Sequence, residues 1–173
     1  MRIRTALSTL ALAALLGSVS LATAQAPEQQ EMDATMQAYM KYAQPGEPHQ
    51  ALNAFIGNWE AKTKFWPTPG APAMESSGKA EHSWVLGGRF VKVGYQGEFM
   101  QQPFEGTGYI GYDNYKQKYV DMWIDNMGTM MLSSQGSYRG EGKLLTMQGS
   151  YDDPVSGQPK TMKSVYRFEG PDR

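Results

Sequence analysis

His82 and Asp125 are the residues whose chemistry first suggests a functional site. His82 is the only histidine in a predicted strand, and Asp125 ends another strand, shortly after Trp123. A histidine that works with a carboxylate can exchange protons with a substrate. One hypothesis is therefore an acid–base enzyme that acts on a small hydrophobic substrate. Two alternatives remain open: His82 as a hydrogen-bonded core or rim residue, and Asp125 as a turn residue that accepts from the backbone near Met127.

Other catalytic patterns are absent from the sequence. It contains no Cys, no H-E-x-x-H motif, no His or carboxylate cluster with metal-ligand spacing and no G-x-S-x-G motif. Its glycines lie within predicted strands, not in a phosphate-binding loop that leads into a helix. We therefore predict no catalytic set, no metal and no cofactor. Haem with His82 or a Met as axial ligand is conceivable in such a barrel but is not expected.

The side chains that could line a binding site lie on predicted strands, where alternate residues point to opposite faces. The side chains predicted to point inward are mostly apolar or aromatic, and a few of them carry polar groups. They are Ala80, His82, Trp84, Val91, Val93, Tyr95, Leu145, Met147, Tyr151, Met162, Ser164, Tyr166 and Phe168. Such a lining can enclose one small apolar or amphipathic molecule, although a barrel filled by its own side chains is the alternative. The predicted ligand-binding residues are His82, Trp84, Tyr95, Tyr109, Trp123, Asp125, Met147 and Tyr166.

The strands that carry these residues are short and are separated by turn residues. Aromatic and β-branched residues predict eight strands, at 59–66, 78–85, 89–99, 104–113, 118–126, 129–137, 143–151 and 159–168. Gly87-Gly88 suits a tight hairpin, and the segments 140–142 and 152–157 suit longer loops that end in a left-handed Gly. Glycines inside the strands, such as Gly94, Gly106 and Gly108, suggest the bends of a small barrel. The prediction is an all-β, antiparallel meander barrel.

Two helices are expected before the first strand. Met32, Met36, Tyr39 and Met40 recur at helical spacing within 31–43, and Pro45-Gly46 ends this helix. Its apolar stripe is expected to dock on the barrel as an outer cover of the strand 118–126, whose two faces are both partly apolar. A second, short helix at 49–55 leads into Gly57-Asn58-Trp59.

The N-terminus has the pattern of a signal peptide. Arg2 and Arg4 precede an apolar run at 6–16, and Ala22-Thr23-Ala24 is a small-residue cleavage signal, with the cut expected after Ala24. The apolar run is shorter than the roughly 20 residues of a spanning helix. Cleavage of 24 of the 173 residues leaves 149, with 14 basic and 17 acidic side chains and a net charge of −3. We expect a periplasmic or secreted protein, with no affinity for nucleic acid or, after signal removal, for membranes.

Several motifs together resemble one bacterial family. They are Trp84-Val85-Leu86-Gly87-Gly88-Arg89-Phe90, Pro103-Phe104-Glu105-Gly106, Ile110-Gly111-Tyr112-Asp113, Tyr119-Val120, Trp123-Ile124-Asp125-Asn126-Met127-Gly128-Thr129 and Gly149-Ser150-Tyr151-Asp152-Asp153-Pro154. The chain resembles, over residues 52–168, a domain-of-unknown-function family numbered fifteen-seventy-nine. The resemblance implies a calycin-like or lipocalin-like barrel without an established activity. The helical turn followed by Gly57-Asn58-Trp59 is similar to the entry of such barrels, where the Trp plugs one end.

The resemblance also implies a longer barrel, because family members continue through further strands where this sequence ends. We therefore expect the barrel to be incomplete at its C-terminus, with bare sheet edges that favour association. The expected organisation is a signal peptide at 1–24, a disordered start and amphipathic helix at 25–48, and the barrel at 49–173. The favoured function is a non-enzymatic, exported protein that binds a small hydrophobic ligand. The alternatives are the acid–base enzyme above and an interaction module that uses the helix stripe and the sheet edges.

Overall fold

The computed structural model describes residues 27–66, 70–139 and 144–170. The predicted signal peptide and the predicted turn at 140–142 lie outside these ranges. The chain divides into two compact units, Met1–Met36 and Gln37–Arg173. In the first unit the described residues are helical, and the second unit contains the whole sheet.

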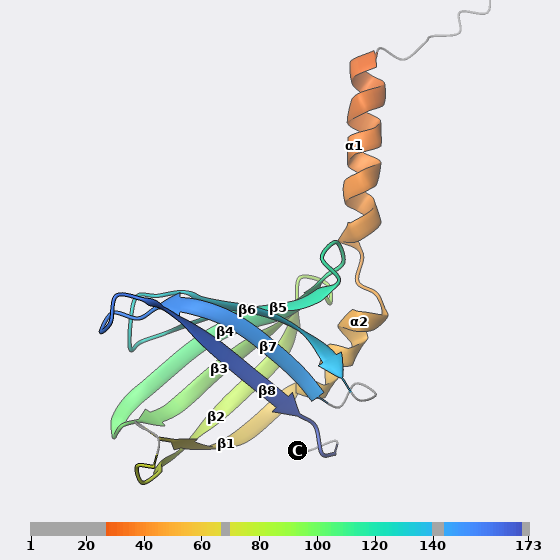
Figure 1. The fold of residues 1–173 in the computed structure, drawn as a ribbon. Helices are drawn as coiled ribbons and strands as arrows, with labels where there is room; N and C mark the ends of the chain where they lie inside the picture. The colour runs from red at the N-terminus through yellow and green to blue at the C-terminus, as the bar shows by residue number, and fades with distance from the viewer. Residues whose placement is uncertain (1–26, 67–69, 140–143, 171–173) are drawn as a thin grey trace, which may run out of the picture. The chain divides into compact units, whose positions relative to one another are not determined.

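Eight antiparallel strands form one sheet in which each strand pairs with the next along the chain, so the predicted meander is confirmed. The sheet curls into a half-barrel (Figure 1). Within the described residues β1 and β8 each pair on one side only, which leaves two open edges. The strands are β1 (Gly57–Phe65), β2 (Met74–Val85), β3 (Phe90–Phe99), β4 (Gln102–Asp113), β5 (Lys118–Asp125), β6 (Leu132–Arg139), β7 (Leu144–Asp152) and β8 (Pro159–Arg167).

The strand register confirms the predicted inward parity. His82 lies opposite Val93, Val93 opposite Gly108, and Gly108 opposite Trp123. These positions alternate with exposed polar residues such as Lys79 and Glu81. Alternation of this kind is expected for a sheet with one solvated face and one covered face.

A helical segment fills one end of the half-barrel. It consists of α2 (Glu47–Gln50) and the 3-10 helix η1 (Ala51–Phe55), and it agrees with the helix predicted at 49–55. Leu52 is fully buried and Phe55 is 4% exposed, and both belong to the core with Val91, Ile110, Tyr119, Leu145 and Met147. The segment is fixed by side chains that hydrogen bond to it, because Trp59 Nε1 donates to the Phe55 carbonyl at 2.8 Å and Tyr119 Oη to the Pro48 carbonyl at 2.9 Å.

The helix α1 (Pro27–Ala43) begins before the predicted start but ends at the predicted residue. In its last turns, Tyr39 and Met40 are 73% and 53% exposed. The expectation that the apolar stripe docks on the barrel is therefore wrong for this part of the helix. Its contacts with the strand connections are made by Tyr42, which packs edge-on against Tyr115 at 5.4 Å between ring centroids, and by the Ala43 carbonyl, which accepts from Arg89 Nε at 3.0 Å.

The connection between β2 and β3 differs from the predicted tight hairpin. Val85 pairs with Phe90, so four residues form the turn, and three of them have a positive φ: Leu86 (51°), Gly87 (65°) and Gly88 (79°). A left-handed backbone at Leu86 extends the turn beyond the glycine pair. The prediction of a left-handed Gly at the end of the loop 152–157 is confirmed, because Gly157 has a φ of 67°.

Candidate functional site

The concave face of the curled sheet forms a partly open cavity of about 340 Å³ beside η1. Its walls come from η1 and from strands of both halves of the sheet, so β2 and β8 contribute to the same space. Most of the lining is apolar or aromatic: Phe55, Val93, Gly108, Ile110, Met122, Trp123, Leu132 and Met162. The residues of the lining that carry polar groups are His82, Tyr109, Asp121, Ser164 and Tyr166. A concave, mostly apolar space with a few convergent polar groups is typical of a small-molecule site.

Asp121 supplies the carboxylate of this cavity. It lies on β5, opposite Ile110 of β4 and Ser134 of β6. Ser134 is 8% exposed, and its hydroxyl donates to Asp121 Oδ1 at 2.6 Å. Among the described residues, this is the hydrogen bond found for the Asp121 carboxylate, which leaves Oδ2 as a further acceptor.

His82 is fixed in one tautomer by its partner. Its Nδ1 lies 2.9 Å from the Phe55 carbonyl oxygen, which can only accept, so Nδ1 carries the proton and Nε2 is the acceptor. Burial lowers the pKa of His82, although the hydrogen bond to Phe55 opposes this shift. His82 is therefore neutral at neutral pH and offers a second acceptor to the cavity.

Tyr166 and Ser164 complete the polar part of the lining from β8. Burial raises the pKa of Tyr166, and the negative charge of Asp121 adds to the rise. The Tyr166 hydroxyl therefore stays protonated, and the side chain packs edge-on against Phe55 at 5.2 Å between ring centroids. The structure thus gathers one carboxylate, one neutral imidazole and the two hydroxyls of β8 around an apolar space.

Four of the eight predicted ligand-binding residues line this cavity: His82, Tyr109, Trp123 and Tyr166. Tyr109 does so from a β4 position whose side chain alternates onto the outer face, opposite Lys92 and Met122. Trp84 and Met147 lie elsewhere. Met147 is a fully buried core residue, and Trp84 packs against the core while its Nε1 donates to Asn53 Oδ1 at 2.9 Å.

Tyr95 lies in a neighbouring hollow of about 310 Å³ near the other ends of the strands. Trp123 borders both spaces, and the second is lined by an aromatic cluster. In this cluster Phe65 packs against Phe99 at 5.2 Å and Tyr95 against Phe104 at 5.6 Å between ring centroids. The Trp123 ring therefore separates the cavity from an aromatic hollow.

Asp125 is not among the residues that line the cavity. Its Oδ1 accepts from the Met127 backbone N–H at 3.0 Å, and its Oδ2 accepts from Trp123 Nε1 at 2.9 Å. The interpretation as a turn residue thus agrees with the structure, and the cavity does not bring His82 and Asp125 together. Sequence reasoning missed Asp121, because both faces of the strand 118–126 are partly apolar and alternation alone does not show that the face with Asp121, Trp123 and Asp125 points inward.

The interior glycines of β4 make room for Trp123. A side chain at Gly106 would collide with the indole ring, and one at Gly108 would collide with the Met122 carbonyl. The pairing of β4 with β5 runs without interruption from Gly106 to Asp113. These two glycines therefore mark the place of an aromatic ring on the sheet and not a bulge.

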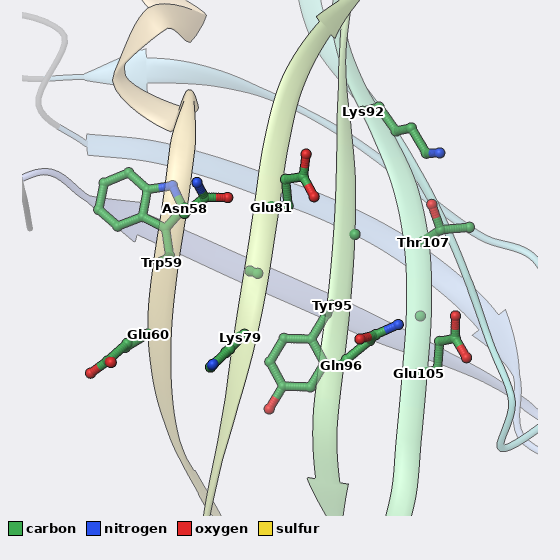
Figure 2. Close-up of a pocket in the computed structure, with 13 residues that line it drawn as sticks. Asn58, Trp59, Glu60, Lys79, Glu81, Lys92, Tyr95, Gln96, Glu105 and Thr107 are labelled. Carbon is green, nitrogen blue, oxygen red and sulfur yellow. The ribbon is translucent and has the colours of Figure 1, made fainter.

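A larger hollow of about 880 Å³ lies over β1–β4. Its charged side chains alternate onto the outer face, and Figure 2 shows Glu60, Lys79, Glu81, Lys92 and Glu105 spread along neighbouring strands. Basic and acidic groups are interspersed there, as on an ordinary solvated face. The chemistry of a binding site is therefore concentrated in the smaller, inner cavity.

A third hollow, of about 660 Å³, lies over β5–β8 and has a basic lining: Lys118, Arg139, Lys163 and Arg167, with no acidic residue among the lining residues that the structure describes. The sequence shows no basic cluster because these residues lie on three different strands, β5, β6 and β8. All four side chains are exposed.

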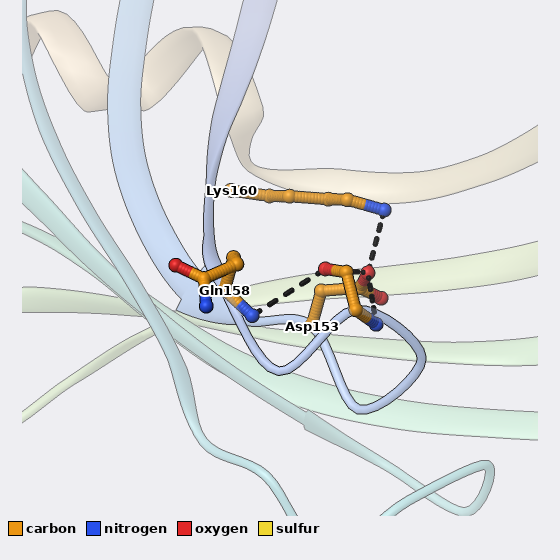
Figure 3. Close-up of polar contacts among 4 residues, drawn as sticks. Asp153, Gln158 and Lys160 are labelled. Atoms are coloured by element: carbon orange, nitrogen blue, oxygen red, sulfur yellow. Dashed lines mark hydrogen bonds and ion pairs between the residues drawn. The ribbon is translucent and has the colours of Figure 1, made fainter.

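The turn between β7 and β8 contains a separate polar cluster around Asp153 (Figure 3). Asp153 is 7% exposed, and its Oδ2 accepts from Ser156 Oγ at 2.6 Å and pairs with Lys160 Nζ at 2.7 Å. The hydrogen bond with Lys160, followed by those with Ser156, holds the pKa of Asp153 well below its usual range. Because Asp153 is occupied by contacts within its own turn, its role is structural.

Residues 44–173 match the model of the family described as a protein of unknown function (DUF1579). The chain belongs to this family. The predicted resemblance is therefore confirmed, and the cavity is a feature of a DUF1579 domain. A search of curated proteins found no match.

Metal-binding clusters and membrane-spanning helices are both absent from the described part of the chain. Among those residues, no group of three or more His, Asp or Glu side chains could hold a metal ion. No helix found there has both the length and the apolar character needed to cross a bilayer.

Proposed function

We propose that this DUF1579 protein is an exported binding protein for a small, largely apolar molecule held in the inner cavity. The observation that carries the proposal is the cavity itself. Its volume of about 340 Å³ lies within the range of roughly 300–1,000 Å³ that is usual for small-molecule sites. Aromatic and aliphatic walls provide the affinity, and the few polar groups set the orientation of the guest.

Export is supported by the N-terminal sequence pattern and places the binding protein in the periplasm or outside the cell. Cleavage after Ala24 predicts a mature chain that begins at Gln25. Mass spectrometry of the protein recovered from the periplasmic fraction or the medium tests this. A cytoplasmic chain that retains residues 1–24 would contradict export without affecting the binding proposal.

Native mass spectrometry of the protein purified from its own host tests ligand binding directly. A small molecule that co-purifies with the folded protein is the expected result. A binding assay with a neutral fluorescent probe, N-phenyl-naphthylamine, provides a second test that does not depend on retention during purification.

A matched pair of valine substitutions locates the binding in the cavity. Val93→Phe places a ring in the lining, whereas Val165→Phe places the same ring on the outer face of β8, where Val165 is 50% exposed. We expect Val93→Phe to weaken probe binding by about tenfold or more, because the larger side chain occupies part of the space that the probe would fill, and Val165→Phe to leave it unchanged. Equal effects of the two substitutions, or no binding to either variant or to the original protein, would contradict the proposal.

A further inference from the structure

The polar groups of the inner cavity are predominantly acceptors. Asp121 contributes a carboxylate whose Oδ1 is used by Ser134, and His82 contributes Nε2 because its Nδ1 proton is used by the Phe55 carbonyl. The hydroxyls of Ser164 and Tyr166 can donate or accept. A guest that brings a hydrogen-bond donor can satisfy these acceptors, whereas a guest that brings only acceptors cannot.

The charge of the cavity also favours a guest that donates hydrogen bonds. No Lys or Arg is among the described residues that line it. On the inner parity of the eight strands, the one basic side chain apart from His82 is Lys160, and it is paired with Asp153 at 2.7 Å. Asp121 therefore has no cationic neighbour in the lining. A carboxylate guest would meet an unscreened negative charge in a partly buried space, where like charges strongly disfavour each other.

We propose that the cavity selects a small apolar molecule that carries a protonated amine, and that it rejects a carboxylate of the same size. The amine pairs with Asp121 Oδ2, its remaining protons reach the hydroxyl groups of β8, and the apolar body lies against Trp123 and Leu132. The aromatic ring of Trp123 also favours a nearby cation. A neutral alcohol satisfies one acceptor but does not compensate the charge of Asp121, so its affinity is intermediate. The inference rests on the proposed function and specifies the ligand class of the same site.

A matched series of probes tests this selectivity at neutral pH. The series consists of methylnaphthalene, naphthylmethanol, naphthylmethylamine and naphthoic acid, which share one ring system and differ in the polar group. Binding is measured by quenching of Trp fluorescence and by calorimetry. We expect the amine to bind at least about tenfold more tightly than the acid, with the alcohol between them.

Two isosteric variants assign the preference to one carboxylate. Asp121→Asn keeps a side chain that can accept from Ser134 but removes the charge, and it should abolish the preference of the amine over the alcohol. Glu81→Gln removes an exposed carboxylate on the outer face of β2, which does not line the cavity, and should keep the preference. Thermal unfolding of both variants shows whether they are folded, and the comparison of probes on the original protein does not depend on either variant.

The outcomes separate the inference from the proposed function. Binding of the hydrocarbon together with equal or tighter binding of the acid than of the amine would overturn the inference and leave the binding function in place. An amine preference that survives Asp121→Asn, or that Glu81→Gln removes equally, would also overturn it. Failure of every probe to bind, including smaller neutral hydrocarbons such as toluene, would overturn the proposed function and this inference with it.

Discussion

At the scale of single residues, the titration of histidine links the cavity to stability. The chain has two histidines, His49 and His82, and burial lowers the pKa of both below 6.5. In the unfolded chain both bind a proton near pH 6.5, whereas in the folded chain they do so only at lower pH. Between these two pKa values the unfolded state holds more protons, so the folded state loses stability as the pH falls.

We expect the free energy of unfolding to decrease as the pH is lowered below 6.5, by at most about 1.4 kcal/mol per pH unit for each histidine. His82→Asn should reduce this slope, because the amide can still donate to the Phe55 carbonyl but does not titrate. Urea denaturation at a series of pH values measures both slopes. A variant slope equal to that of the original protein would show that His82 does not contribute.

Gly106 provides a second prediction at this scale. Gly106→Ala forces the Trp123 ring to move, because the added carbon would overlap it, and we expect a loss of about 1–3 kcal/mol in the free energy of unfolding. Gly94→Ala is the matched control in the neighbouring strand, where the added carbon would lie 3.7 Å from the Glu81 carbonyl oxygen. Guanidinium denaturation of the two variants, with near-UV circular dichroism of the indole, measures the difference. Similar losses in both variants would mean that the backbone requires glycine at these positions and that contact with the Trp123 ring is not the cause.

At the scale of elements, the segment from α2 to η1 fills the end of the half-barrel. Leu52 and Phe55 enter the core, while Trp59, His82 and Tyr119 hydrogen bond to the carbonyls of Phe55 and Pro48 within the segment. Burial raises the pKa of Tyr119 to about 12, which keeps its hydroxyl protonated as the donor of this bond. The segment is therefore held by the core and by side-chain donors, which together compensate for its short helices.

Leu52→Ala tests how much the segment contributes to stability. Removing a fully buried Leu side chain should lower the free energy of unfolding by about 2–5 kcal/mol. Leu86→Ala, at a residue that is 69% exposed, should change it by less than about 0.5 kcal/mol. Urea denaturation measures both. A small effect at Leu52 would show that the segment can leave the sheet without loss of the core.

At the scale of the whole sheet-containing unit, Phe55 connects two strands that are distant in the meander. Its ring lies 6.3 Å from His82 of β2 and 5.2 Å from Tyr166 of β8, and 4.9 Å from Phe168, between centroids. No pairing of β8 with β1 is found among the described residues. The aromatic contacts of Phe55 thus take the place of strand pairing at this end of the half-barrel.

Phe55→Ala should therefore loosen both halves of the sheet together. We expect amide hydrogen exchange to accelerate in β2 and in β8, since both lose the same partner. Phe104→Ala, in the aromatic cluster beside Tyr95 and Phe99, should accelerate exchange in β3 and β4 and spare β8. Exchange measured by mass spectrometry resolves these strands. Acceleration confined to β2 after Phe55→Ala would show that the two halves are independent.

The sequence by itself determined the eight antiparallel strands, the inward direction of residues such as His82 and Val93, the helix before the first strand and the family. Periodicity and turn residues act over a few neighbours, so they can be recognised without knowing the fold. Only the tertiary structure decided that Asp121 and not Asp125 lines the cavity, that Met147 is core, and that Tyr39 and Met40 remain exposed. It also decided where four basic residues from three strands meet on the outer face. These outcomes depend on how far the sheet curls and on which hydrogen-bond partner each polar group reaches, and neither is encoded in local spacing.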